Sequence, residues 1–327
     1  MTILVTGGAG YIGSHTVRML RNSQRDVVVL DSLEFGHRAA VGDAELVVGN
    51  IRDRVLVTEL CREHKVTQIV HFAAYKAVGE SMEQPDRYWL NNVAGSVDLL
   101  EAALATGVRE VVFSSSCSVN GTPEKLPVDE ASPIAPESVY AESKAMVERI
   151  LSWYGVTHQL RAVSLRYFNA AGATADATIG EDWSRAQNLV PLVMKATLGK
   201  RPPVEIFGTD YPTPDGTCIR DYVHVDDLAD AHIRSLNYLR DGGAGTTLDI
   251  GTGTGTSVFE IIRATERISG RQVPHVVSAR RAGDPVATYA DPTKARTTLG
   301  WTATRTLDDI IESAWRWHST HPEGFVG

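Results

Sequence analysis

The chain has 327 residues, of which 43% are hydrophobic and 22% charged, as in ordinary globular proteins. Its formal net charge of −8 argues against a general nucleic-acid binder. Three widely separated cysteines without a CxxC pair indicate neither a zinc site nor a redox pair, and they favour a reducing compartment. The start lacks the pattern of a signal peptide, and no apolar run approaches the about 18 residues of a membrane span. We therefore expect a cytoplasmic protein that uses no metal and binds neither nucleic acid nor membrane.

The first half of the chain alternates between strand-like and helix-like segments. Short apolar runs predict strands at 2–6, 26–31, 45–50, 67–74, 109–116 and 161–169. Apolar periodicity predicts helices at 11–22, 53–64 and 92–106, and another that begins near residue 140. Nearly continuous apolar strands between helices indicate a parallel sheet covered on both faces, with right-handed crossovers. The predicted fold class is α/β, with a doubly wound Rossmann sheet.

The pattern changes in the second half. The segment 169–188 is rich in small and polar residues, and 201–217 contains four prolines and two glycines, so both are expected to be mostly loop. Further helices are predicted at 226–239, 258–268 and 307–317. We predict a dinucleotide-binding domain at 1–168, to which 218–240 returns, and a smaller α/β substrate domain at 169–327.

A glycine-rich turn follows the first predicted strand. In VTGGAGYIG, Gly7, Gly10 and Gly13 permit a tight turn and a close approach of the backbone to a pyrophosphate, at the start of a helix. Asp31 ends the next strand, 18 residues after Gly13, where its carboxylate can accept hydrogen bonds from ribose hydroxyls. The same carboxylate would repel a 2′-phosphate, so the pattern favours NAD over NADP. A glycine-rich turn without a ligand is the plainer alternative.

A tyrosine and a lysine stand four residues apart in the stretch YAESK. Tyr140 and Lys144 would share one helix face, and a nearby cation lowers the pKa of a phenol. Tyr140 would then serve as an acid/base near neutral pH. Ser114 and Ser116 end the fifth strand and offer hydroxyls at the edge where doubly wound sheets hold ligands. The alternatives are an incidental pair on a surface helix and serines that merely end a strand.

Together these features resemble the extended short-chain dehydrogenase/reductase family. The resemblance lies in GGAGYIG, in the serine run after a strand and in YxxxK. Longer stretches are similar to the UDP-glucose 4-epimerases within that family: HFAAYKAVGES (71–81), LRYFNAAGA (165–173), IFGTDYPTPDGTCIRDYVHVDDLADAH (206–232) and WRWHSTHPEGF (315–325). These motifs are much more specific than YxxxK or GxGxxG, and the resemblance covers essentially the whole chain.

The resemblance assigns roles to individual residues. It implies that Tyr140 is the acid/base at the 4-hydroxyl of the sugar, that Lys144 binds the nicotinamide ribose and lowers the pKa of the tyrosine, and that Ser116 bridges tyrosine and substrate. It implies cofactor contacts from Gly7, Gly10, Tyr11, Ile12, Gly13, Asp31, Asn50, Ile51, Phe72, Lys76, Asn91, Ser114, Tyr140, Lys144 and Tyr167. It implies UDP-sugar contacts from Lys76, Ser116, Tyr140, Asn169, Arg185, Asn188, Leu189, Phe207, Arg220, Arg281, Asp284 and Thr288. Arginines suit a diphosphate because their planar forks bind oxygens bidentately, although as isolated residues they would be surface ion-pair partners.

The implied reaction is a redox-neutral inversion at C4 of a UDP-sugar. Tyr140 removes the O4 proton while hydride moves from C4 to NAD, and the resulting 4-keto sugar turns and takes the hydride back on its other face. NAD is regenerated in each cycle, so it should stay bound. The family also implies a homodimer through two long helices, near 92–106 and 140–154.

Some positions depart from the pattern of the family. Asn120 replaces a usual tyrosine, and Asn50 replaces an aspartate that commonly faces the adenine, although an amide can still hydrogen-bond there. Arg185, in the unusual loop EDWSRAQN, could pair with a sugar carboxylate or could point to solvent. Thr288 stands where some members carry a tyrosine that narrows the sugar pocket, so an N-acetyl group could fit.

Alternatives to UDP-glucose and UDP-galactose therefore remain open. UDP-glucuronate would use Arg185, and UDP-N-acetylglucosamine would use the space beside Thr288. A net oxidoreductase or a dehydratase on the same fold is a third alternative, but a dehydratase needs an acid/base pair where this chain has Cys117 and Ser118. A non-catalytic regulator that binds nucleotide sugars would not need Ser116, Tyr140 and Lys144 together.

Overall fold

The structure is a computed structural model that describes residues 1–183, 186–281 and 283–325. It divides into two compact units. Unit 1 comprises Met1–Gly121, Pro133–Arg166 and Ala229–Leu248, and unit 2 comprises Thr122–Ser132, Tyr167–Leu228 and Asp249–Gly327. The predicted division into a dinucleotide domain and a substrate domain concerns what each part binds, and it stays a prediction.

Unit 1 is built on a seven-stranded sheet with the order β11-β6-β5-β4-β1-β2-β3. The strands are β1 (Thr2–Thr6), β2 (Asp26–Asp31), β3 (Glu45–Val48), β4 (Val66–His71), β5 (Glu110–Ser114), β6 (Arg161–Tyr167) and β11 (Thr246–Ile250). Strands β1 to β6 pair in parallel. β1 and β2 are buried along almost their whole length, as expected for strands covered on both faces. This strand order confirms the predicted doubly wound Rossmann fold.

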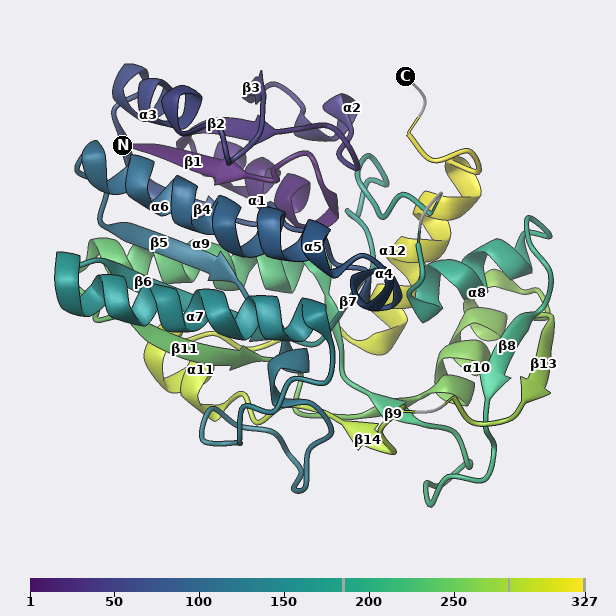
Figure 1. Cartoon of the computed structure of the whole chain (residues 1–327). Helices are drawn as coiled ribbons and strands as arrows, with labels where there is room; N and C mark the ends of the chain where they lie inside the picture. Colours follow the sequence, from purple (N-terminus) through teal and green to yellow (C-terminus); the bar gives the residue numbers. More distant parts are fainter. Residues whose placement is uncertain (184–185, 282, 326–327) are drawn as a thin grey trace. The chain divides into compact units, whose positions relative to one another are not determined.

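Helices cover both faces of this sheet. Figure 1 shows α3, α6 and α7 on one face and α1 and α9 on the other. The helices are α1 (Tyr11–Asn22), α2 (Arg38–Val41), α3 (Arg54–Glu63), α4 (Val78–Glu83), α5 (Pro85–Tyr88), η1 (Trp89–Ala94), α6 (Gly95–Ala105), η2 (Cys117–Asn120), α7 (Val139–His158) and α9 (Val225–Arg240). The helix predicted at 92–106 has a π-helical first segment, η1, before α6. The core between the sheet and α3, α6 and α7 consists of aliphatic side chains such as Leu4, Ile69, Leu99 and Val111.

Unit 2 consists of helices packed on three small sheets. Its strands are β7 (Asn169–Ala171), β8 (Val204–Phe207), β9 (Ile219–Arg220), β10 (Tyr222–His224), β12 (Thr256–Ser257), β13 (His275–Ser278) and β14 (Ala287–Thr288). They form the sheets β10-β7, β12-β9-β14 and β13-β8. Its helices are α8 (Leu189–Thr197), α10 (Val258–Ser269), α11 (Thr293–Leu299) and α12 (Leu307–Thr320).

Two segments of unit 2, 169–188 and 201–217, are mostly loop in their described residues, as predicted, but each contains a short strand that was not predicted. The first begins with β7, and the second contains β8. β8 follows two prolines and becomes a strand because β13, some 70 residues later, pairs with it in parallel. None of the described helices is long and apolar enough to cross a lipid bilayer.

Candidate functional site

The glycine-rich turn lies between β1 and α1. Gly7 has a φ of +72°, and a Cβ there would lie 2.6 Å from the backbone nitrogen of Ala73, so only glycine fits. A Cβ on Gly13 would lie 2.2 Å from the Gly7 carbonyl oxygen. Gly10 is the N-cap residue of α1 and has no side chain to satisfy the N–H groups of the first helical turn. The turn therefore offers a helix N-terminus to an anion, and Tyr11 and Ile12 form the first helical positions behind it.

Asp31 ends β2 beside this turn. The Ala9 N–H donates to Asp31 Oδ2 and the Leu33 N–H donates to Asp31 Oδ1, both at 2.9 Å. The carboxylate is buried, with 8% of the residue exposed, and burial raises its pKa despite these two hydrogen bonds. The His37 N–H also donates to the Ala9 carbonyl, at 2.9 Å. The loop after β2 is thus attached to the glycine-rich turn at both of its ends.

The segment after β4 carries Lys76 and Phe72. Lys76 is exposed, and Phe72 packs against His232 of α9 with ring centroids 4.6 Å apart. Asn92 in η1 holds this segment, because its Oδ1 accepts from the Tyr75 N–H at 2.9 Å and its Nδ2 donates to the Tyr75 carbonyl at 3.0 Å. Asn91, the predicted cofactor contact, donates to Asn92 Oδ1 at 3.1 Å.

Tyr140 and Lys144 lie in the first two turns of α7. Ser138 caps this helix, because its hydroxyl accepts a hydrogen bond from the Ala141 N–H at 3.2 Å. Lys144 is buried, with 3% exposed, and its Nζ donates to the carbonyl oxygen of Ser114 at 2.7 Å. The structure therefore joins the predicted lysine to the end of β5, where the predicted serines lie.

The pKa values in this cluster correct one expectation. Loss of water around the phenol raises the pKa of Tyr140 to about 12, and a hydrogen bond with Ser116 opposes this rise. Burial lowers the pKa of Lys144 to about 7, while the charge of Glu148 opposes that shift. Lys144 Nζ lies 6.0 Å from the centroid of the Tyr140 ring. The pKa of Tyr140 is therefore raised and not lowered as predicted, because desolvation of the phenol is the largest cause of its shift.

Ser116 is the N-cap residue of η2 and is buried, with 9% exposed. Its hydroxyl oxygen accepts from the Ser118 N–H at 3.2 Å and from the Ser118 hydroxyl at 2.9 Å. Because both contacts use its oxygen, the Ser116 hydroxyl proton can be donated to the ionised form of Tyr140. Asn120, a departure from the pattern of the family, is buried and donates to the Pro133 carbonyl at 3.0 Å, so it fixes the end of η2.

A buried ion pair lies behind these residues. Arg166 on β6 donates to both oxygens of Glu148 on α7, with contacts of 2.9 and 2.6 Å. The Ser115 hydroxyl donates to the same carboxylate at 2.5 Å. Glu148 lies one helical turn after Lys144, so this pair supports the face of α7 that carries the lysine.

The other predicted cofactor contacts are more dispersed. Ile51 is buried, whereas Asn50 is exposed and its Oδ1 accepts from the Arg52 N–H at 2.9 Å. Tyr167 is the last residue of β6 and belongs to unit 2 by its contacts. The roles of these residues toward a cofactor stay predictions.

In unit 2, four of the predicted substrate residues are connected through β9. Arg220 pairs with Asp284 at 3.5 Å and donates to the Pro285 carbonyl at 2.9 Å. Arg220 and Thr288 face each other in the parallel pair β9–β14. The Asn169 N–H donates to the carbonyl of Asp221, the residue after Arg220, at 3.0 Å. Thr288 is buried, and its hydroxyl has no hydrogen-bond partner among the described residues.

The remaining predicted substrate residues form separate contacts. The Arg281 guanidinium lies 4.2 Å from the centroid of the Phe207 ring. Asn188, the N-cap residue of α8, is exposed and donates to Glu181 at 3.2 Å, while Leu189 is half-buried in the first turn. Arg185 lies outside the described residues.

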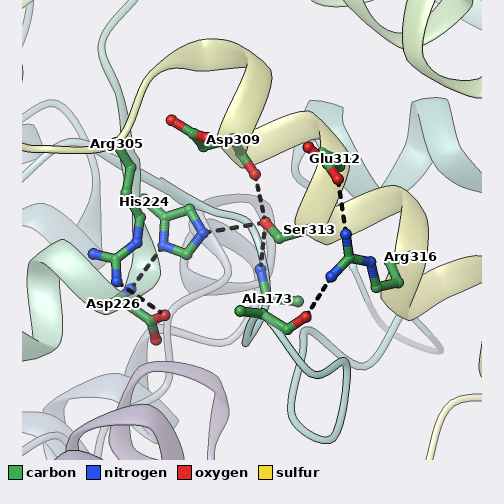
Figure 2. Close-up of a pocket in the computed structure, with 9 residues that line it drawn as sticks. Ala173, His224, Asp226, Arg305, Asp309, Glu312, Ser313 and Arg316 are labelled. Carbon is green, nitrogen blue, oxygen red and sulfur yellow. Dashed lines mark hydrogen bonds and ion pairs between the residues drawn. The ribbon is translucent and has the colours of Figure 1, made fainter.

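Unit 2 also contains a hollow that the sequence did not indicate. Its volume is about 230 Å³, and it is lined by Ala173, Ala175, His224, Asp226, Arg305, Asp309, Glu312, Ser313 and Arg316. Figure 2 shows that its charged groups pair within the unit, with Arg316 bonded to Glu312 at 2.7 Å and His224 to Ser313 at 3.1 Å. None of the predicted site residues lines this hollow, so we assign it no role in the reaction.

Sequence reasoning missed several residues that position the site. Asn92 and Ser143 are both buried, and Asn92 donates to the Ser143 hydroxyl at 3.2 Å, which connects η1 to α7. His71 is buried between Thr6, at 2.8 Å, and Ser96, at 2.9 Å. The adjacent asparagines inside an otherwise apolar helical stretch were a usable signal, because polar groups in a buried helix require partners. Nothing in the sequence indicated the partners of His71.

Known proteins are similar to this chain over its whole length. The NAD dependent epimerase/dehydratase family matches residues 3–251. A UDP-glucose 4-epimerase of Lacticaseibacillus casei is 46% identical over 327 residues, which cover 99% of both chains. A UDP-glucose-4-epimerase from Stenotrophomonas maltophila, solved with bound NAD and formylated UDP-arabinopyranose, has a TM-score of 0.96 at 41% identity and covers 98% of this chain and 99% of its own. A UDP-Glc/GlcNAc 4-epimerase from Campylobacter jejuni has a TM-score of 0.86 at 38% identity and covers 98% and 99%.

These likenesses extend over both units and agree with the geometry of the turn, the strand ends and α7. The resemblance predicted from the sequence motifs is confirmed. The chain belongs to the NAD dependent epimerase/dehydratase family.

Proposed function

We propose that this chain is an isomerase that interconverts UDP-glucose and UDP-galactose with a tightly bound NAD. The observation that carries the proposal lies within unit 1. Ser116, Tyr140 and Lys144 meet at the carboxyl end of β5, on the same sheet whose β1 and β2 end in the glycine-rich turn and Asp31. Relatives that share this whole chain are UDP-glucose 4-epimerases.

The residues of unit 1 fit NAD. A pyrophosphate would take the N–H groups at the start of α1. Gly10 lies at this position without a side chain, and a Cβ there would meet only the Gly7 carbonyl oxygen, at 3.3 Å, within the protein. Asp31 would accept from the adenosine ribose and would repel a 2′-phosphate. When bound at these residues, NAD would supply a reversible hydride acceptor for C4 of the sugar, which is the chemistry that inversion through a 4-keto sugar requires.

Tyr140 moves the proton in this mechanism. Its phenolate takes the proton of the sugar O4 as C4 becomes a carbonyl, and its phenol gives the proton back when the carbonyl is reduced. Because burial raises the pKa of Tyr140 to about 12, the phenolate needs stabilisation within the site. The hydroxyl of Ser116 donates to it, which is the contribution that opposes the raised pKa.

Lys144 holds the reacting parts in place. Its contact with the Ser114 carbonyl fixes the ammonium group at the end of β5, from where its other protons can be donated to a ribose hydroxyl. A pKa of about 7 means that this group loses charge as the pH rises above neutrality. The protein thus orients the sugar and shifts one proton, and the sugar leaves with no net oxidation.

Unit 2 supplies groups suited to the UDP end of the substrate. Arg220 and Arg281 are two guanidinium groups that fit a diphosphate, and Phe207 is an aromatic partner for a flat base. The 3.5 Å separation of Arg220 from Asp284 leaves this pair free to rearrange around an anion. The buried hydroxyl of Thr288, without a partner among the described residues, suits a hydroxyl of the sugar.

UDP-N-acetylglucosamine is a second candidate substrate. The side chain of Thr288 is small, and the solved UDP-Glc/GlcNAc 4-epimerase matches over 98% of the length of this chain, at 38% identity. Pocket size changes preference by only about 10- to 200-fold per methylene, so both sugars can be substrates. The proposed use of UDP-glucuronate depends on Arg185 and rests on the sequence alone.

We also propose that the chain forms a homodimer. Trp153 and Val156 on α7 are 68% and 74% exposed, and Leu90 on η1 is 49% exposed. Large apolar side chains that gather on one face of a long helix are typical of an interface. Trp153→Glu should shift the protein from dimer to monomer in sedimentation velocity, and a monomeric wild-type protein would contradict the proposal.

We place the protein in the cytoplasm. Its three cysteines, Cys61, Cys117 and Cys218, are all free thiols, which suits a reducing compartment. Burial raises the pKa of Cys61 to about 11, so that thiol is also chemically inert.

A substrate panel tests the proposed function. The purified protein is incubated without added cofactor with UDP-glucose, UDP-glucuronate and UDP-N-acetylglucosamine in turn, and the C4 epimers are resolved by chromatography. We expect UDP-glucose to be converted to a mixture with UDP-galactose. Failure to convert any of the three, with NAD present in the protein, would instead indicate a net redox enzyme or another UDP-sugar. Arg185→Ala should slow only the uronate, if the uronate reacts at all.

A further inference from the structure

A cluster of side chains joins the loop after β2 to the segment after β4. Glu34 lies on the loop 32–37, Tyr75 follows β4, and Arg87 lies on α5. The Tyr75 hydroxyl donates to Glu34 at 2.7 Å, and Arg87 pairs with the other oxygen of the same carboxylate. β1 lies between β2 and β4 in the sheet, and all three strands are parallel. The cluster therefore lies across the carboxyl ends of β2, β1 and β4, where the glycine-rich turn follows β1.

One half of the cluster is rigidly supported. Asn92 binds both the N–H and the carbonyl of Tyr75. The Arg87 guanidinium lies over the Tyr75 ring, 4.0 Å from its centroid, and donates to a second carboxylate, Glu80, at 2.5 Å. Tyr88, which is fully buried, donates to the same Glu80 at 2.8 Å. Contacts that do not involve Glu34 therefore hold Tyr75 and Arg87 in place.

The other half is a loop under local strain. Leu33 has a φ of +57°, a left-handed conformation that a leucine adopts only when its surroundings impose it. Contacts impose it here, because the Leu33 N–H is bound by Asp31 and the far end of the loop is bound by Ala9. Phe35 packs its ring edge-on against Tyr75, with centroids 5.8 Å apart, and is 42% exposed. Glu34 and Phe35 therefore attach a strained, exposed loop to the rigid half.

We propose that Glu34, Tyr75 and Arg87 form a clasp that retains the bound dinucleotide and sets the rate at which it leaves. The inference rests on the proposed binding of NAD by unit 1. The adenosine diphosphate half of NAD would lie against the glycine-rich turn and Asp31, at the strand ends that the clasp spans. Glu34 must release both partners before the loop can move away and let the cofactor exchange.

The chemistry of the three groups suits retention. Burial and the hydrogen bond to Glu34 raise the pKa of Tyr75, so its hydroxyl remains a donor at neutral pH. Arg87 bears a permanent charge, and its second ion pair, with Glu80, fixes the guanidinium in the position from which it binds Glu34. A reaction that regenerates NAD in each cycle does not need cofactor exchange, so slow release costs the enzyme nothing in turnover.

The test measures cofactor exchange, independently of turnover. Purified wild-type protein, Glu34→Gln, Arg87→Met and Tyr75→Phe are mixed with excess isotopically labelled NAD, and the bound NAD is recovered over time and analysed by mass spectrometry. Asp43→Asn is the control, because it removes an exposed ion pair with Arg21 at the other end of α1. Melting temperature reports on folding in every variant, and Glu34 is on an exposed loop where Gln should be tolerated.

We expect exchange to be at least about tenfold faster in Glu34→Gln and Arg87→Met, which corresponds to about 1.4 kcal/mol less retention. Tyr75→Phe should be intermediate, since it keeps the ring beneath Arg87. Asp43→Asn should exchange like wild type. Equal exchange rates in wild type, Glu34→Gln and Arg87→Met would overturn the clasp while leaving the proposed reaction intact. A wild-type protein that neither carries nor takes up NAD would overturn both.

Discussion

Two arginine–carboxylate pairs, one in each unit, differ in how firmly they are held. Arg166 and Glu148 in unit 1 are 7% and 10% exposed, and Arg166 makes contacts as short as 2.6 Å. Arg220 and Asp284 in unit 2 are 19% and 26% exposed and 3.5 Å apart. A buried, bidentate pair fixes its surroundings, whereas a longer, more exposed pair can exchange its partner for a ligand. This difference supports the proposal that unit 1 carries out the chemistry with fixed groups and that unit 2 recognises the substrate with adaptable ones.

The ionisable groups at the end of β5 in unit 1 support the same contrast. Burial shifts the pKa of Tyr140 to about 12 and that of Lys144 to about 7. Strongly perturbed groups at the end of a sheet are typical of catalytic positions. In unit 2, Arg220 and Thr288 lie on two-residue strands, and Arg281 and Asp284 lie on a connecting loop, where side chains adapt to ligands.

The largest expected effect is on the chemistry of unit 1. Tyr140→Phe removes the hydroxyl that carries the proton, so kcat for UDP-glucose should fall roughly 100- to 10,000-fold. Bound NAD and the melting temperature should remain those of wild type, because the ring is kept. The measurement is steady-state kinetics together with NAD content. A variant that retains the wild-type kcat would show that Tyr140 is not the acid/base.

The next effect concerns the stability of unit 1. Arg166→Met leaves Glu148 buried without its cation, and removing one partner of a buried pair costs about 3–5 kcal/mol. Urea unfolding should show this loss, and Asp284→Asn in unit 2 is the matched comparison, with a loss of less than about 1 kcal/mol. Similar losses in both variants would remove the distinction between a fixed pair and an adaptable one.

A smaller effect should separate binding from chemistry. Arg220→Met removes one charged donor proposed for the diphosphate, and a hydrogen bond to a charged group contributes about 1.5–3 kcal/mol. KM for UDP-glucose should rise by roughly 10- to 150-fold while kcat changes little. Lys195→Met, which removes a cation of unit 2 that donates to the Trp183 carbonyl, should leave KM unchanged. A fall in kcat with an unchanged KM in Arg220→Met would contradict the assignment of unit 2 to recognition.

A last effect, spread over several pH units, is one in which the two units should be alike. Burial lowers the pKa of His71 in unit 1 and of His318 in unit 2 to about 3, from an ordinary value of 6.5. The unfolded chain binds more protons than the native one between these values, so stability is lost as the pH falls from about 6.5 towards 3, by at most about 1.4 kcal/mol per pH unit and histidine.

Replacement of either histidine should reduce this acid sensitivity. His71→Asn and His318→Phe should each give a shallower decrease of unfolding free energy between pH 6.5 and 4 than wild type, measured by urea titration. The carboxyl groups of Asp31 and Asp221, whose pKa values burial raises, act in the opposite direction and are the same in all three proteins. An identical slope in wild type and both variants would show that these histidines are not neutral in the native state.

Strands β1 to β6 of the sheet of unit 1 were predictable because they are short apolar runs that need no partner from elsewhere to be recognised, whereas β11 was not predicted. β1 and β2 were predicted at their observed bounds. The short strands of unit 2 were not, since β8 depends on a partner some 70 residues later and β9 has two residues. Local patterns identify elements that are buried on both faces, and they miss elements that exist only through distant pairing.

The candidate site shows the same limit. Tyr140 and Lys144 were visible because four residues separate them on one helix. The direction of the pKa shift of Tyr140 was predicted wrongly, because sequence spacing reveals a neighbouring cation but not the loss of water around both groups. The clasp of Glu34, Tyr75 and Arg87 joins segments 41 to 53 residues apart in the sequence, and no local pattern indicated it.

The most direct test of the central claim follows one atom. UDP-glucose carrying deuterium at C4 is incubated with the purified protein in ordinary water without added cofactor, and the UDP-galactose that forms is analysed by mass spectrometry and NMR. We expect deuterium to remain at C4 in essentially every product molecule, because the hydride leaves and returns within one active site. Product that has lost the label to solvent, or conversion that requires added NAD, would contradict it.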